Sequence, residues 1–157
     1  MNRKLWQPQM EELPDAGRVL AIDLRGHGES ELVPGPNRME LFADDCKEFL
    51  DALGIQKAVL CGLSMGGYIC MAFYRKYAAH VAGIVFTATR AGADTPAARE
   101  NRDKVIAQVT SQGPDPIVES MVSKVLSPFK TRNVKMSTYS NNSKSDVCIS
   151  YLEPSPS

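Results

Sequence analysis

Three short apolar runs in the first part of the chain predict buried β-strands. They span residues 18–24, 57–61 and 82–88, and the first ends at a turn that contains Gly26 and Gly28. Uninterrupted apolar runs of this length are typical of strands that are covered on both faces of a parallel sheet.

Two helices are predicted between these strands. Asn37 and Glu40 form a capping-box-like pair, and Gly54 supplies a left-handed stop. Between them, apolar side chains recur along one helix face: Phe42, Cys46, Phe49, Leu50 and Leu53. Residues 65–79 are apolar on nearly all sides, which predicts a buried helix. The alternation of strands and helices therefore predicts an α/β fold with a parallel-sheet core over residues 1–94.

The pattern changes after Gly92. Thr95-Pro96 and Asp115-Pro116 each place a capping residue before a proline at the first helical position, which predicts helices at about 96–110 and 116–126. Their apolar stripes are weaker, so we expect residues 95–128 to cover something rather than to form a core layer.

The last part of the chain has another composition. Residues 130–157 hold seven serines and three asparagines but no alanine or glycine. Beyond a weak apolar run at 147–152 no period emerges, so residues 129–157 are expected to be a disordered, low-complexity tail.

Charge excludes several classes of partner. The 157 residues include 18 basic and 18 acidic side chains, so the formal net charge is zero. A chain without basic excess is a poor candidate for nucleic acid or for an anionic membrane surface. Residues 58–74 are uncharged, but glycines interrupt them and the pattern changes midway, so we interpret them as a strand followed by a helix, not as a membrane span.

The cysteines and histidines predict no cofactor and no metal centre. Neither the two histidines nor the four cysteines (Cys46, Cys61, Cys70 and Cys148) have ligand spacing. Free thiols in a reducing, cytoplasmic compartment are the simpler account of the cysteines. A dinucleotide site is disfavoured because Glu31 stands where the third glycine of the fingerprint that starts at Gly26 would be.

One motif carries chemistry. Gly62-Leu63-Ser64-Met65-Gly66 has the pattern G-x-S-x-G, and it falls where a predicted strand meets a predicted helix. A nucleophilic serine must stand clear of the sheet, which requires a sharp, strained turn with small residues two positions to either side. The helix behind Ser64 would direct free N–H groups towards an oxyanion.

With these residues the chain resembles the α/β-hydrolase fold superfamily. It is most similar to small hydrolases such as enol-lactone hydrolases, arylesterases and cofactor-free haloperoxidases. The matching segments cover roughly residues 3–128: Leu5-Trp6-Gln7-Pro8-Gln9, Asp23 to Ser30, Gly62 to Gly67, and Thr89 to Thr95. The resemblance implies that Ser64 is the nucleophile, that the backbone N–H of Met65 is one oxyanion donor, and that residues 95–127 begin a helical cap. Related dehalogenases and epoxide hydrolases carry aspartate where this chain has Ser64, so serine favours acyl transfer on a small carboxylic ester or lactone.

The chain also departs from the family pattern. The His-Gly-x-Pro loop that supplies the second oxyanion donor would precede the segment at Asn2, and the triad acid and histidine would follow the cap. The chain thus resembles the middle of a hydrolase that is cut at both ends. Because the family's pocket walls come from the cap and from loops outside this chain, the resemblance implies no particular substrate.

Residues inside the chain are weak substitutes for the triad partners. His27 fits a structural turn, and His80 lies a helix length from Ser64. Asp94 follows the third strand but has no histidine to orient, and Asp23 is better suited to fixing a loop. The charged residues of the first predicted helix are expected to form a solvated face: Asp44, Asp45, Lys47 and Glu48.

The resemblance has a consequence for the sheet. In the family, the strands that match 18–24 and 57–61 are separated by an earlier strand that this chain lacks. Unpaired buried backbone groups cost about 1–3 kcal/mol each. The strands must therefore leave a gap, pair differently or borrow a strand, and we expect marginal stability and self-association through unpaired edges.

Two hypotheses of function remain open. The first is a serine esterase or lactonase, complete in a longer form, that uses Ser64 in an acyl-enzyme. The second is a non-catalytic product of the same ancestry, such as a splice form, a pseudoenzyme or a prematurely terminated reading frame. The sequence leaves open whether this chain alone is an enzyme.

Overall fold

The computed structural model describes residues 2–13, 17–118, 120 and 148–154. The chain divides into two compact units, Met1–Ala91 with Lys144–Ser157, and Gly92–Ser143. Residues 119, 121–147 and 155–157, on which the second half of the predicted cap and most of the predicted tail fall, lie outside the described residues. None of the helices that the structure describes has the length and apolar character needed to cross a membrane.

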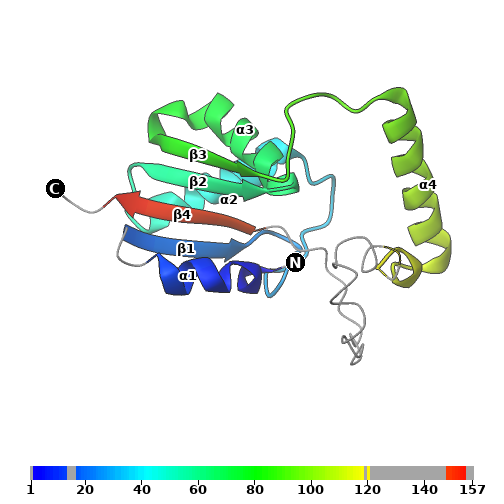
Figure 1. Cartoon of the computed structure of the whole chain (residues 1–157), viewed down its shortest axis with the longest axis horizontal. Helices are drawn as coiled ribbons and strands as arrows, with labels where there is room; N and C mark the ends of the chain where they lie inside the picture. Colours follow the sequence, from blue (N-terminus) through cyan, green and yellow to red (C-terminus); the bar gives the residue numbers. More distant parts are fainter. Residues whose placement is uncertain (1, 14–16, 119, 121–147, 155–157) are drawn as a thin grey trace. The chain divides into compact units, whose positions relative to one another are not determined.

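The first unit is built on a four-stranded sheet in the order β1-β4-β2-β3 (Figure 1). Its strands are β1 (Gly17–Asp23), β2 (Ala58–Leu63), β3 (Val81–Thr87) and β4 (Cys148–Pro154). The three predicted runs thus form strands, each within two residues of its predicted bounds. β2 and β3 pair in parallel, and β4 is antiparallel to both β1 and β2, so β1, β2 and β3 all run the same way.

The expectation of a disordered tail is wrong for residues 148–154. β4 fills the gap that the sequence predicted between the first two strands, with Leu152 opposite both Val19 of β1 and Val59 of β2. Backbone groups on two half-buried strands need partners, and the weak apolar run at 147–152 supplies them within the same chain. The sequence left three outcomes open for these strands: a gap, a different pairing or a borrowed strand. The chain shows a different pairing, because β4 lies between β1 and β2 and is antiparallel to both.

Two helices cover one face of this sheet (Figure 1). They are α2 (Met39–Ala52) and α3 (Met65–Tyr77), and η3 (Ala78–His80) follows α3. Gly54 ends α2 at φ +71° as predicted, but Asn37 is not the cap, because Arg38 occupies that position without a side-chain bond. The apolar stripes of both helices meet β2 in the core, where Leu50, Leu60 and Phe73 are almost fully buried.

The chain begins with short helices that the sequence did not predict, η1 (Arg3–Trp6) and α1 (Gln7–Glu12). They lie beside β1, and Trp6 is their one buried residue. Helices of four and six residues are too short to show an apolar period.

The second unit contains α4 (Pro96–Gln112). The Thr95 hydroxyl accepts a hydrogen bond from the Ala98 N–H at 3.2 Å, as expected of an N-cap before proline. Residues 115–118 and 120 are also helical, where the second cap helix was predicted.

Candidate active site

The turn between β2 and α3, residues 62–67, reverses the chain within one residue. Ser64 lies at its centre with φ +52° and ψ −112°, a backbone conformation that residues other than glycine rarely adopt. The Ser64 side chain is exposed, although its neighbours Gly62, Gly66 and Gly67 are buried. Strain of this kind costs about 1–3 kcal/mol and persists only where the surroundings impose it.

Close backbone contacts explain the glycines of this turn. A Cβ atom on Gly62 would lie 2.5 Å from the carbonyl carbon and oxygen of Gly66, far inside contact distance. A Cβ atom on Gly67 would collide with the Thr89 side chain, which follows β3. The strand, the turn and the helix can therefore approach this closely only because these residues lack side chains.

Two backbone hydrogen bonds fix the serine. The Ser64 N–H donates to the Thr87 carbonyl at 2.9 Å, and the Ser64 carbonyl accepts from the Gly67 N–H at 3.0 Å. The Ser64 hydroxyl has no hydrogen-bond partner among the described residues. Met65 is the first residue of α3, and the N–H groups of a first helical turn have no acceptor within the helix. The hydroxyl and a free donor thus share one turn.

The structure brings together the four residues that the sequence predicted as a site, Gly62, Ser64, Met65 and Gly66. The catalytic roles of Ser64 and Met65 stay predictions. Sequence reasoning missed the Thr87 carbonyl that holds Ser64, because a backbone contact between two strands leaves no signature in residue type.

Neither histidine of the chain is bonded to Ser64. His27 is 9% exposed, its Nδ1 lies 2.8 Å from the Arg25 carbonyl, and its ring packs edge-on against Phe42. His80 precedes β3, at the edge of the sheet opposite Ser64, and its Nδ1 lies 2.9 Å from the Gln56 carbonyl. Both rings have local structural contacts.

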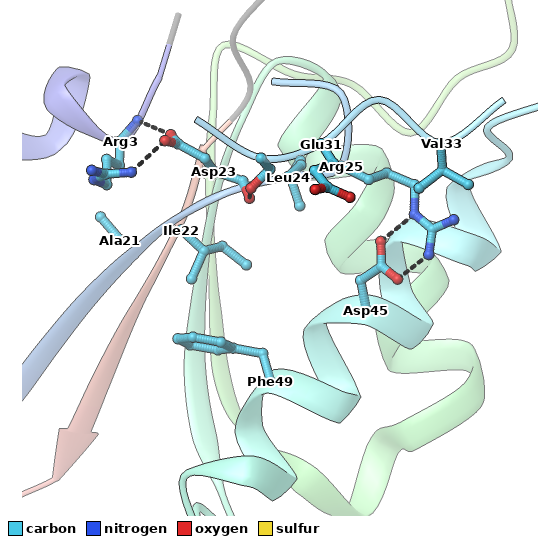
Figure 2. A pocket seen from close by; sticks show the side chains of 11 residues that line it. Arg3, Ala21, Ile22, Asp23, Leu24, Arg25, Glu31, Val33, Asp45 and Phe49 are labelled. Atoms are coloured by element: carbon cyan, nitrogen blue, oxygen red, sulfur yellow. Dashed lines mark hydrogen bonds and ion pairs between the residues drawn. The ribbon is translucent and has the colours of Figure 1, made fainter. Parts of the chain in front are cut away.

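Asp23 ends β1 and fixes the loop that follows it, residues 24–33 (Figure 2). Its carboxylate accepts hydrogen bonds from the Arg3 N–H and guanidinium, both at 2.6 Å, and from the Glu29 N–H at 3.2 Å. Burial alone would raise the pKa of Asp23, but the backbone N–H groups of Arg3 and Glu29 and the Arg3 charge together lower it. Asp23 is therefore a buried, ionised anchor.

The acidic side chains of α2 do not form a plain solvated face. Asp45 accepts two hydrogen bonds from the Arg25 guanidinium in the loop after β1 (Figure 2). Asp44 accepts a hydrogen bond from the Tyr77 hydroxyl at 2.6 Å and forms an ion pair with Lys76, and both partners lie in the last turn of α3. These bonds connect α2 to its neighbours. Of the four charged residues that were expected to form a solvated face, Asp44, Asp45, Lys47 and Glu48, only Glu48 is exposed. Helix periodicity does not reveal such partners.

Asp94 belongs to the second unit, where it pairs with a residue of α4. Its carboxylate accepts a hydrogen bond from Arg102 Nε at 2.5 Å. This partner on the next helix gives Asp94 a structural contact near the start of α4.

A cavity of about 550 Å³ lies at the carboxyl end of β1 (Figure 2). The loop after β1 and α2 line it, with Ile22, Val33 and Phe49 as apolar walls and the Arg3–Asp23 and Arg25–Asp45 pairs on its rim. No residue of the 62–67 turn takes part.

The described residues offer no cluster of metal-ligating side chains, and the thiol of Cys70 is not activated. No group of three metal-ligating side chains occurs in the described ranges. Cys70 lies on α3 behind the turn, and burial, with a smaller effect of Cys61, raises the pKa of its thiol to about 12. Ser64 is therefore a better candidate nucleophile than Cys70.

Comparisons with known proteins identify the family. Residues 1–150 match the profile described as alpha/beta hydrolase fold. The chain belongs to the α/β hydrolase fold family. Over 63 residues, or 40% of its length, it is 44% identical to 3-oxoadipate enol-lactonase 1 of Acinetobacter baylyi, and this match covers 23% of that protein. It is also 42% identical over 69 residues to epoxide hydrolase 4 of Mus musculus, covering 41% of this chain and 18% of that one.

A solved relative agrees over most of the structure. A thermophilic esterase from Thermogutta terrifontis superposes with a TM-score of 0.73 and 42% identity, over 85% of this chain and 49% of that one. The chain thus spans about half the length of this α/β hydrolase.

Proposed function

We propose that this chain supplies the nucleophile of a serine hydrolase that cleaves a small carboxylic ester or lactone through an acyl-enzyme. The observation that carries the proposal is the exposed Ser64 at φ +52°, held between the end of β2 and the start of α3. The Ser64 hydroxyl has no bonding partner among the described residues, so the hydroxyl itself contributes nothing to the fold that would explain the strain at this position.

The proposed reaction uses two groups of the 62–67 turn. Ser64 Oγ attacks the carbonyl carbon, and the carbonyl oxygen becomes an oxyanion that accepts a hydrogen bond from the Met65 N–H. The positive end of the α3 dipole stabilises the same charge. The bond from carbon to the leaving oxygen then breaks, the leaving oxygen takes up, through solvent, the proton that the Ser64 hydroxyl released on attack, and water later hydrolyses the acyl-serine to the carboxylic acid and free Ser64.

The identity of the nucleophile favours esters and lactones among the family's substrates. The relatives named above include an enol-lactonase, an esterase and an epoxide hydrolase, so the family alone leaves the reaction open. The epoxide hydrolases that this chain resembles use an aspartate, whereas this chain has Ser64. A serine forms an ester with an acyl group, which water can hydrolyse.

A second candidate function is non-catalytic, and one observation favours it. Both histidines are engaged with backbone carbonyls, and neither is bonded to Ser64. A serine without a general base keeps only the part of catalysis that the oxyanion donor and binding supply, about 10³–10⁴-fold over water. Without a base, the proposed function predicts that activated esters acylate Ser64 slowly, whereas the non-catalytic function predicts no acylation of Ser64.

The thiols support a reducing, cytoplasmic location, which is also part of the proposal. Cys46 and Cys70 are buried in the core and form no disulfide among the described residues. Thiols of this kind behave as small apolar side chains, for which no oxidising compartment is needed.

Labelling with a fluorophosphonate probe tests the proposal. Ser64 Oγ would bond to phosphorus as fluoride leaves, and we expect one label that Ser64→Ala abolishes and Ser111→Ala leaves intact. Ser111 is an exposed serine on α4 and is the matched control. If the folded protein takes no label, or if Ser64→Ala is labelled equally, the non-catalytic function replaces the proposed one.

A further inference from the structure

Two strained residues follow neighbouring strands of the sheet. Among the residues that the structure describes, Ser64 and Ala88 are the two other than glycine with a positive φ, +52° and +47°. The last pair in the parallel register of β2 and β3 is Leu63 with Thr87, so each strained residue occupies the next position along its own strand. Strain of this kind persists only where neighbouring contacts impose it, and it is concentrated at functional sites.

Thr87 restrains the start of the 62–67 turn. Its carbonyl accepts the hydrogen bond from the Ser64 N–H at 2.9 Å, which joins the ends of the two strands. The Ser64 N–H cannot rotate away without losing this acceptor, so the bond fixes the direction in which the chain leaves β2. The residues after Ser64 belong to α3, and this bond does not restrain them.

Thr89 restrains the other end of the turn. Its side chain lies against Gly67 in the first turn of α3: a Cβ atom on Gly67 would be 2.6 Å from Thr89 Oγ1 and 2.7 Å from Thr89 Cβ. Ala88 connects this contact to the Thr87 bond, and a single left-handed residue changes the direction of an extended chain. Ala88 is therefore strained where the chain turns from β2 towards α3.

The contact between Thr89 and Gly67 depends on the shape of the threonine side chain. Thr89 Oγ1 is buried and has no hydrogen-bond partner among the described residues. A buried hydroxyl without a partner costs free energy, so the hydroxyl does not account for a threonine at this position. The branched side chain instead fills the space over Gly67, where it gains van der Waals contact with the backbone of α3.

We propose that Thr89 is a positioning residue for the 62–67 turn: its branched side chain holds the first turn of α3 in place, so that Ser64 keeps its strained conformation beside the Met65 N–H. Without this side chain, Gly67 gains room to move towards the end of β3, and Ser64 relaxes out of the left-handed region. Thr89 acts on the Ser64 hydroxyl through the backbone of the turn. The consequence for catalysis rests on the proposed function, whereas the consequence for the turn does not.

Hydrogen exchange of single backbone amides, followed by NMR, tests the effect on the turn. In Thr89→Ala we expect the Ser64 amide to exchange about tenfold faster than in the unmodified protein, because the turn opens locally. The Ile55 amide is the internal control: it donates to the Leu50 carbonyl at 2.9 Å, and its exchange rate should be unchanged. Thr89→Val keeps the branched shape without the hydroxyl, so the Ser64 amide should exchange slowly again.

Labelling with the fluorophosphonate probe tests the effect on the nucleophile, in variants whose circular dichroism is unchanged. Thr89→Ala should lower the labelling rate at saturating probe by about tenfold or more, since a reacting group displaced by about 1 Å can lose about a hundredfold in rate. The probe concentration that gives half of this rate should stay the same. Thr89→Val should restore the rate, and Thr110→Ala is the matched control, because Thr110 is an exposed threonine on α4.

The two measurements separate a failure of this proposal from a failure of the proposed function. If the unmodified protein takes no label, the proposed function fails, and the exchange of the Ser64 amide alone decides the role of Thr89. Equal exchange of this amide in Thr89→Ala and in the unmodified protein would overturn the proposal, and so would a Thr89→Val protein that exchanges as fast as Thr89→Ala. In protein that takes the label, equal labelling rates of Thr89→Ala and Thr110→Ala would also overturn it.

Discussion

The two connections at the carboxyl edge of the sheet differ in how their polar groups are satisfied. In the loop after β1, Asp23 accepts hydrogen bonds from Arg3 and Glu29, and the Ser30 hydroxyl donates to the Asp23 carbonyl at 2.7 Å. His27 is turned onto the Arg25 carbonyl of the same loop. In the 62–67 turn after β2, only backbone groups are bonded, and the Ser64 hydroxyl is exposed without a partner among the described residues.

This difference separates structural polar residues from a candidate catalytic one. In the loop after β1, Arg25 is bonded to Asp45 of α2, Glu29 to Arg3 and the His27 ring to a backbone carbonyl, and the loop gains rigidity from these bonds. The 62–67 turn carries backbone strain and leaves one reactive group free, which stabilises nothing in the fold. Both connections follow the end of a strand, so position alone does not distinguish them. Whether a polar side chain is hydrogen-bonded within the fold is therefore the better guide to function.

The largest effect is expected from Gly62→Ala. Its Cβ atom would lie 2.5 Å from the backbone of Gly66, which cannot rotate away, so we expect the free energy of unfolding to fall by about 3 kcal/mol in urea titrations. Gly92→Ala is the control, because no atom lies within 4 Å of its Cβ position. A Gly62→Ala protein as stable as the control would show that the turn is not tight.

Asp23→Asn is expected to cost about 2 kcal/mol, because charge-assisted hydrogen bonds to Arg3 and Glu29 are weakened. The Asp23 side chain is 4% exposed, whereas Asp51, on the surface of α2, is 53% exposed, and Asp51→Asn should change stability little.

The same variant has a pH signature. The folded pKa of Asp23 lies below its ordinary value of 3.8, so its stabilisation is present above that value and is lost as the pH falls through the folded pKa. The gap in unfolding free energy between the unmodified protein and Asp23→Asn should therefore be full at pH 7 and close below about pH 4. A gap that widens on acidification would contradict this account.

A smaller effect of the opposite sign is expected at the 62–67 turn. Ser64→Gly should raise the unfolding free energy by about 1 kcal/mol relative to Ser64→Ala, because glycine adopts φ +52° without strain but loses more entropy on folding. Both variants lack the hydroxyl, so thermal or urea unfolding isolates the backbone effect. Equal stability of the two would remove the evidence for strain.

The smallest effect is expected at His27. His27→Asn should leave the rate of Ser64 labelling by the fluorophosphonate unchanged, since the ring is bonded to the Arg25 carbonyl. A labelling rate that falls with His27→Asn, in protein with unchanged circular dichroism, would make His27 a participant.

The sequence predicted the parts of this structure that depend on local pattern. The apolar runs bounded by loops predict the strands β1, β2 and β3, but the expectation that all three are buried is wrong: only β2 has fully buried positions, and Val85 and Phe86 of β3 are about half exposed. The spacing of Gly62, Ser64 and Gly66 specifies the turn, because crowding within five residues requires residues without side chains. Gly54 ends α2 for a different local reason, its φ of +71°, which glycine adopts without strain.

The sequence did not predict the features that depend on distant contacts. β4 lies between strands far from it in the chain, and its weak apolar run has meaning only beside the unpaired edges of β1 and β2. The bonds of Asp45 to Arg25 and of Asp44 to Tyr77 are invisible to a helical period, which shows only which face is apolar.

Acylation of Ser64 by an activated ester is the most direct test of the central claim. The protein is incubated with a p-nitrophenyl ester and followed by intact-mass and peptide mass spectrometry, beside Ser64→Ala. We predict a single acyl group that accumulates on the peptide containing Ser64 and is absent from the variant. Acylation spread over surface lysines and serines, with Ser64 unmodified in folded protein, would contradict the claim that this turn presents a nucleophile.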